Sequence, residues 1–151
     1  MTRTPLILLA AGGSLATLLA AFGFQYLGGL APCHLCLLQR WPHAAAVLIG
    51  LLALAWPWRW FCAGGALAAL TTAAIGVYHS GVERHWWEGP TTCTSGSIAG
   101  LKPADLLTQI LAAPVVRCDE LGWTMLGLSM ANLNVALSLG LALIWVAAAR
   151  R

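Results

Sequence analysis

The sequence predicts an all-α membrane protein, a bundle of four transmembrane helices with two loops on one side of the bilayer. Hydrophobic residues make up 60% of the 151 residues, and charged residues make up only 9%. The mean hydropathy of +0.79 is too high for a soluble domain of this length. The charged residues leave four uncharged windows of at least 18 residues, at 5–39, 41–58, 60–82 and 121–149. A helix needs roughly 20 residues to cross about 30 Å of hydrocarbon, so each window can hold one span.

Tryptophan positions support this count. We predict spans at about 6–27, 42–56, 60–79 and 123–149, and we expect helices because backbone groups in lipid must find partners within their own segment. Six tryptophans fall near the ends of these spans, where an amphipathic ring favours the headgroup zone. They are Trp41, Trp56, Trp58, Trp60, Trp123 and Trp145, and no tryptophan of the chain falls mid-span.

The first predicted span follows Arg3 and invites comparison with a signal peptide. Its apolar stretch is longer than a typical signal core, it lacks a convincing cleavage site, and three further spans follow it. We therefore expect it to be retained as a transmembrane helix.

Orientation depends on the basic residues. An even number of spans puts both termini and the 56–60 hairpin on one side. That side holds Arg3, Arg59, Arg150 and Arg151, and the other holds Arg40, Arg84, Lys102 and Arg117. The first set lies closer to span ends in short segments, where positive charge favours the cytoplasm. We expect cytoplasmic termini and exterior loops at about 28–40 and 81–120.

The first exterior loop carries a Cys-x-x-Cys pair, Cys33 and Cys36, followed by Arg40. Two thiols at this spacing can close a small ring, bind a metal or exchange disulfides. If the chain before Arg40 is already helical, Cys36 and Arg40 share one face, and the guanidinium would favour a Cys36 thiolate. The plainer alternatives are an interfacial anchor at Arg40 and an inert structural bridge between the cysteines. Pro42 suits the first turn of the second span.

The second exterior loop carries the next two cysteines, Cys93 and Cys118. Four of the five cysteines thus share one aqueous face, and an even number on an exported face suggests disulfides. Between Cys93 and Cys118, residues 102–114 predict a short amphipathic helix at the membrane surface. Cys62 falls inside a span, where we expect it to be a small packing residue.

Two histidines lie near the exterior ends of spans, His43 in the second and His79 in the third. Such histidines are commonly interfacial hydrogen-bonding residues. Ionisable groups at membrane depth are also functional candidates, and with Arg40 these histidines suggest a pocket around the thiol pair. In the fourth span, Asn132 and Asn134 are candidates for interhelical hydrogen bonds.

Taken together, these features resemble the bacterial disulfide bond formation protein B (DsbB) family. The resemblance rests on Pro32-Cys33-x-x-Cys36 with Arg40, on the spaced second pair, on Cys118-Asp119-Glu120 before the last span, and on four spans. It covers essentially the whole chain and implies a single membrane domain, residues 1–151. The implied activity is that of a protein-disulfide:quinone oxidoreductase of the bacterial inner membrane.

The resemblance also implies a path for thiol exchange. A reduced DsbA-like partner, a periplasmic thioredoxin-fold oxidase, would attack a Cys93–Cys118 disulfide at Cys93. The freed Cys118 would then attack Cys33 and release Cys36 as a thiolate. The catalytic residues implied are therefore Cys33, Cys36, Cys93 and Cys118.

A quinone, ubiquinone or menaquinone, is the implied acceptor of the electrons. The residues implied at the quinone are Arg40, near a ring carbonyl, Cys36, and His79 as a helper. The expected partners are the DsbA-like oxidase, the membrane quinone pool and the lipid bilayer. We expect no nucleic-acid partner and no resident metal.

Three alternatives from other classes stay open. The four exterior cysteines could bind one structural zinc ion. His43 and His79 could ligate haem in a four-helix electron carrier, although Leu37 after Cys36 rules out the Cys-x-x-Cys-His attachment motif. A membrane scaffold without redox chemistry is the third.

Overall fold

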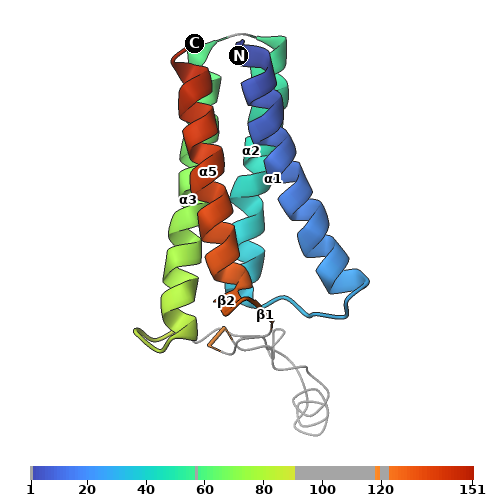
Figure 1. Cartoon of the computed structure of the whole chain (residues 1–151), viewed down its shortest axis with the longest axis vertical. Helices are drawn as coiled ribbons and strands as arrows, with labels where there is room; N and C mark the ends of the chain where they lie inside the picture. The colour runs from blue at the N-terminus through green and yellow to red at the C-terminus, as the bar shows by residue number, and fades with distance from the viewer. Residues whose placement is uncertain (1, 57, 91–117, 120–122) are drawn as a thin grey trace, which may run out of the picture.

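Four long helices form the protein in the computed structural model, which describes residues 2–56, 58–90, 118–119 and 123–151 (Figure 1). The helices are α1 (Arg3–Tyr26), α2 (His34–Ala55), α3 (Arg59–Glu83) and α5 (Met130–Ala149). A short antiparallel hairpin of β1 (Thr124–Met125) and β2 (Leu128–Ser129) precedes α5. Each of the four helices is long and apolar enough to cross a membrane. The predicted four-helix membrane bundle is confirmed.

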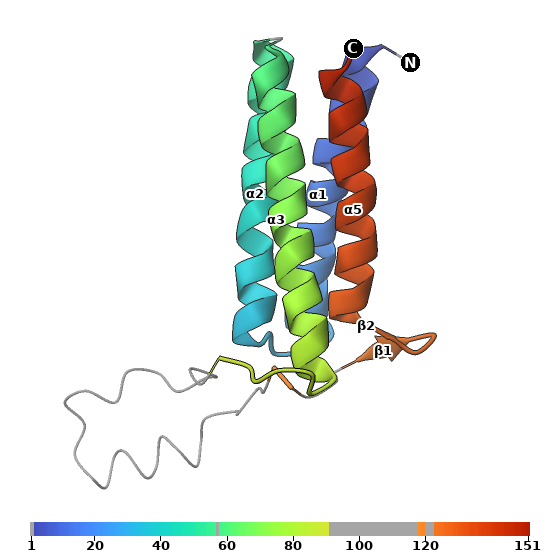
Figure 2. The ribbon, with the colours of Figure 1, turned by 90° about the vertical axis from the view of Figure 1, so that its left-hand side faces the viewer.

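The helices pack as a closed ring in which α1 contacts α2, α2 contacts α3, α3 contacts α5, and α5 contacts α1. Both termini lie at the same end of the bundle as the turn between α2 and α3, and the β hairpin lies at the opposite end (Figures 1 and 2). The start of α2, with its thiol pair, is therefore at the end of the bundle that holds the hairpin.

The core at the terminal end is built around Trp145 of α5, which is fully buried. A Cβ atom at Gly65 of α3 would come within 2.5 Å of its indole ring, so only glycine leaves room for it there. Cys62 is also fully buried in this cluster, as predicted for a packing residue. Trp145 is thus an exception to the interfacial tryptophans, because small residues on α3 admit its ring to the interior.

Helix α2 begins at His34, so Pro42 lies inside the helix, and its predicted place in the first turn is wrong. The earlier start has a local cause. Cys33 is the N-cap residue, and its sulfur accepts a hydrogen bond from the backbone N–H of Cys36 at 3.2 Å. The capped first turn extends the helix through Pro42, at the cost of one backbone hydrogen bond.

The other end of the bundle also differs from the predicted spans. Helix α3 continues to Glu83, and α5 begins only at Met130. The hairpin before α5 turns at Leu126 and Gly127, both with positive φ, as tight two-residue hairpin turns require. The predicted surface helix at 102–114 and Cys93 lie outside the described residues.

Candidate functional site

The thiol pair lies at the N-terminus of α2, where Cys33 caps the helix and Cys36 lies in its first turn. Both are free thiols, with their sulfur atoms 2.8 Å apart, and Cys33 donates its proton to Cys36. Cys33 is buried and Cys36 is half-buried. The hydrogen bond to Cys36, followed by burial, raises the pKa of Cys33 well above its ordinary value. In the reduced pair, Cys33 therefore keeps its proton and Cys36 is the acceptor.

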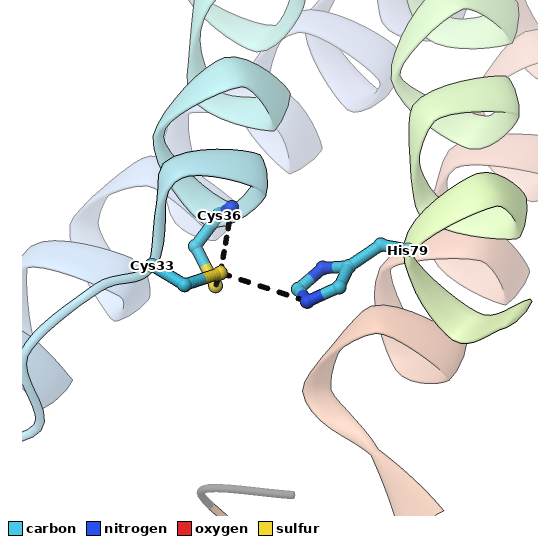
Figure 3. A group of neighbouring side chains, drawn as sticks. All are labelled: Cys33, Cys36 and His79. Carbon is cyan, nitrogen blue, oxygen red and sulfur yellow. Dashed lines mark hydrogen bonds between the residues drawn. The ribbon is translucent and has the colours of Figure 1, made fainter. Parts of the chain in front are cut away.

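His79 reaches the pair from α3, and Figure 3 shows its ring pointing at the sulfur of Cys33. Its Nε2 atom lies 3.6 Å from Cys33 Sγ and 3.8 Å from Glu83 Oε1. On the other side of the ring, Nδ1 lies 2.9 Å from the amide nitrogen of Gln39. That nitrogen is only a donor, so Nδ1 is the acceptor and Nε2 carries the proton of a neutral ring. The N–H of His79 thus faces Cys33 and Glu83.

Gln39 is held in this orientation by three elements. Its amide nitrogen also donates to the backbone oxygen of Leu35 at 3.1 Å. The oxygen of Gln39 accepts a hydrogen bond from Asn134 Nδ2 of α5 at 2.7 Å. Asn134 Nδ2 also donates to Thr72 Oγ1 of α3 at 3.1 Å. Every donor in this chain of bonds meets an acceptor, which fixes the amide of Gln39 and, through it, the proton position on the histidine.

The predicted interhelical role is confirmed for Asn134 but not for Asn132, whose side chain bonds to Ser129 within the start of its own helix. Asn134 also binds the second histidine, since His43 Nε2 lies 2.9 Å from Asn134 Oδ1. His43 is buried and is held by this amide. His43 and His79, the two histidines considered as haem ligands, therefore each have one ring nitrogen within hydrogen-bond distance of a side-chain amide.

Arg40 follows Gln39 directly but points to the other side of α2. Its guanidinium donates to Gln25 Oε1 at 2.6 Å and to the backbone oxygen of Ala21 at 3.4 Å, both on α1. It also lies 4.9 Å from the ring centroid of Phe22. The predicted common pocket of Arg40 with the two histidines is therefore wrong, because successive side chains on a helix leave it about 100° apart.

Cys118, which lies between α3 and β1 in the chain, lies in the same cluster as the thiol pair. It is buried and packs in one cluster with Cys33, Leu35 and Val82. Nearby, Glu83 accepts a hydrogen bond from Ser129, which joins the end of α3 to the start of α5. Cys93 lies outside the described residues.

The donor atoms of Cys33, Cys36 and His79 lie within 4.8 Å of one another. Two sulfurs and an imidazole are a donor set that a zinc ion accepts. The predicted four-cysteine zinc site needs Cys93, which the described part of the chain does not include. The same close thiols are equally arranged for dithiol–disulfide chemistry.

Sequence reasoning missed two residues of this site, Gln39 and Glu83. Gln39 falls in an uncharged window beside the more conspicuous Arg40, and Glu83 falls within the predicted loop at 81–120. The spacing of Gln39 could have indicated its role. It lies one helical turn after Leu35 and Cys36, so it shares their face of the helix, and that face is buried if the thiols are buried.

Comparisons with known proteins agree with one another. The family model for disulfide bond formation protein DsbB matches residues 3–148. Disulfide bond formation protein B of Albidiferax ferrireducens is 30% identical, over 91% of this chain and 87% of that protein. Disulfide bond formation protein B 2 of Pseudomonas aeruginosa is 32% identical, over 83% of this chain and 78% of that protein. Disulfide bond formation protein B of Aeromonas salmonicida is 28% identical, over 91% and 83%. No solved structure matches the chain.

Proposed function

Because the chain belongs to the disulfide bond formation protein DsbB family, we propose that it is a protein-disulfide:quinone oxidoreductase. Family membership makes it an oxidoreductase of disulfide bond formation, with four helices able to span a membrane. In the proposal it reoxidises a DsbA-like thiol oxidase of the periplasm and passes the electrons to membrane quinone. It lies in the bacterial inner membrane, with its termini in the cytoplasm and both redox loops in the periplasm.

The observation that carries the proposal is that Cys118 and Cys33 lie in one cluster of buried residues. In the resting enzyme the pairs are the disulfides Cys93–Cys118 and Cys33–Cys36. A thiolate of the partner attacks Cys93, and its second thiolate then closes the partner's own disulfide, so both electrons stay on Cys93 and Cys118. Thiolate exchange requires the attacking sulfur to approach the target sulfur closely, which the shared cluster allows.

Cys118 then attacks Cys33, and Cys36 leaves as a thiolate. Two features of α2 stabilise this leaving group. Cys36 lies in the first turn, at the positive end of the helix dipole, and the Arg40 charge one turn later acts on it. Attack of Cys93 on the Cys33–Cys118 bridge completes the transfer, re-forming the second-loop disulfide and leaving two thiols at Cys33 and Cys36.

The surface beside Arg40 fits a quinone. Phe22 of α1, whose ring centroid lies 4.9 Å from Arg40, is 43% exposed, and its ring stacks on that of Tyr26 at a centroid distance of 6.2 Å. A planar, lipid-soluble ring can stack on such residues from the bilayer, and a guanidinium can donate to its carbonyl oxygen. When bound, the quinone accepts two electrons and two protons from the dithiol. Arg40 is held towards this surface by Gln25, which positions its charge.

His79 was expected beside the quinone, but its Nε2 atom lies 3.6 Å from Cys33 Sγ. In the proposal it therefore acts on the Cys33 sulfur. Its N–H stabilises negative charge on that sulfur during exchange and can return a proton to it. Gln39 serves this step by keeping the proton on Nε2.

The test is an assay of the purified protein with a reduced DsbA-like oxidase and either ubiquinone or menaquinone. The proposal expects one quinone consumed for every two partner thiols lost. Cys36→Ser should abolish both signals, and Cys62→Ser, which removes a thiol buried in the core at the terminal end, should retain them. Partner oxidation that proceeds without loss of quinone would refute the quinone-linked reaction.

A further inference from the structure

The end of the bundle opposite the thiol pair holds a basic cavity that the redox reaction does not use. Its volume is about 700 Å³, and its lining includes Arg3, Arg59, Arg150, Arg151, Trp58 and Trp60. These residues come from the starts of α1 and α3 and from the end of α5, all at the end of the bundle that holds both termini (Figure 2). Half of the eight Lys and Arg residues of the chain therefore surround one cavity.

The described segments that build this end of the bundle, 2–56, 58–82 and 123–151, contain no acidic residue. All five acidic residues occur between positions 83 and 120, and none occurs in 1–82 or 121–151, the segments that build this end. Arg3 donates to Cys62 Sγ at 3.3 Å. The guanidinium groups of Arg59, Arg150 and Arg151 line the same cavity, so their positive charge favours an anion there. Guanidinium groups also match the paired oxygens of a phosphate, which they bind through two parallel hydrogen bonds.

An apolar groove of about 610 Å³ continues from the cavity along the outside of α3 and α5. The two share Arg59, Trp60, Ala149 and Arg150, so they form one continuous feature. Beyond the shared residues, the groove is lined by Ala63, Ala66, Leu67, Leu70 and Val146. From Trp60 to Leu70 a helix rises about 15 Å, which is the depth of one leaflet's hydrocarbon.

A basic cavity at the headgroup level matches the phosphate of a phospholipid, and an apolar groove one leaflet deep matches one of its acyl chains. We propose that this end of the protein binds one anionic phospholipid, with its phosphate among the arginines and an acyl chain along α3 and α5. The site is separate from the thiol pair, and the proposal is independent of the proposed redox function. Charge complementarity selects an anionic lipid over a zwitterionic one.

The experiment is native mass spectrometry of the full chain, released from micelles that contain equal amounts of phosphatidylglycerol and phosphatidylcholine with the same acyl chains. The proposal expects one retained phosphatidylglycerol that saturates. Arg59→Gln with Arg150→Gln should lower its retention about fivefold for each arginine removed. Arg84→Gln is the matched control, because this arginine lies at the opposite end of α3, over the Trp86 ring, and it should leave retention unchanged.

Two further variants separate lipid binding from folding and from charge alone. Arg151→Gln changes an exposed residue at the end of the chain and should weaken retention without altering thermal unfolding. Ala63→Phe fills the groove from an exposed position and should lower retention with the charge intact. Equal retention of the two lipids, or an equal loss in Arg84→Gln, would overturn the proposal. Displacement of the lipid by millimolar inorganic phosphate would overturn it in favour of a free-anion site.

Discussion

Replacing Gln39 by leucine is the sharpest test of how His79 is held. The substitution keeps the approximate size of the side chain but removes its donor and its acceptor. His79 Nδ1 then loses its partner at 2.9 Å, and Asn134 Nδ2 loses its partner at 2.7 Å. Asn134 keeps its bond to Thr72, so the histidine nitrogen is the atom left fully unpaired.

The magnitude follows from these losses. A buried polar group left without a partner costs about 1–3 kcal/mol, and two such groups are created, one of them only partly unpaired. Gln39→Leu should therefore lower the free energy of unfolding by about 2–4 kcal/mol. If the cost lies in the bond to His79, Gln39→Leu with His79→Leu should cost less than the sum of the single changes, by about 1 kcal/mol or more.

Two measurements check this reasoning. Urea unfolding in micelles gives the double-mutant cycle, and nitrogen NMR of labelled histidine gives the proton position on His79. In the parent protein the proton should be on Nε2, and in Gln39→Leu it should be shared between the two nitrogens. Gln25→Leu, whose side chain contacts Arg40 on the other side of α2, should leave the His79 signal unchanged. Additive stability effects, or a parent His79 protonated on Nδ1, would refute the assignment.

Three further predictions follow from other contacts. Arg40→His should chiefly weaken quinone use, raising the quinone concentration needed for half-maximal rate about tenfold or more, because a charge-assisted hydrogen bond is lost; wild-type rates over a range of quinone concentrations would contradict it. Because the pKa of Cys33 is raised by its hydrogen bond to Cys36 and by burial, brief iodoacetamide treatment of the reduced protein should modify Cys36 before Cys33, as read by peptide mass spectrometry. Gly65→Ala should lower the free energy of unfolding in urea by about 1–3 kcal/mol, since its Cβ would meet a buried indole at 2.5 Å. Gly12→Ala is the control, because its Cβ would meet no described neighbour within 4 Å, and it should not destabilise the protein.

The four spans were predictable from the sequence because hydrocarbon imposes a length and a composition that no other environment demands. Helix ends were less accessible to sequence reasoning. Pro42 suggested a first turn, but the cap at Cys33 starts α2 eight residues earlier. Trp145 suggested an interface, but glycine at position 65 makes space for it in the core. In both cases a local contact outweighs a preference that is true only on average.

The site was predictable where it is local in sequence. Cys33, Cys36 and Arg40 follow from motif and spacing, because one helical turn separates the thiol from the arginine. The partners of His79 could not be predicted in the same way. Gln39 lies 40 positions from it, and nothing in either segment specifies which face of α2 turns towards α3. That choice is made by the packing of four helices together.

The different directions of Gln39, towards α3, and Arg40, towards α1, give the thiol pair two different surroundings. Cys33 lies on the protein side, buried beside Cys118 and in reach of His79. Cys36 is half-buried, one turn from an arginine that faces α1 and its exposed aromatic rings. In the proposed reaction, electrons enter at Cys33 from other cysteines and leave at Cys36 towards lipid. Exchanging Gln39 and Arg40 in the sequence would exchange these surroundings, placing the charge towards His79 and the amide towards α1. The order of the two cysteines in the motif is therefore coupled to the order of Gln39 and Arg40, so that exchanging the latter pair should abolish quinone-linked turnover even though every side chain type is kept.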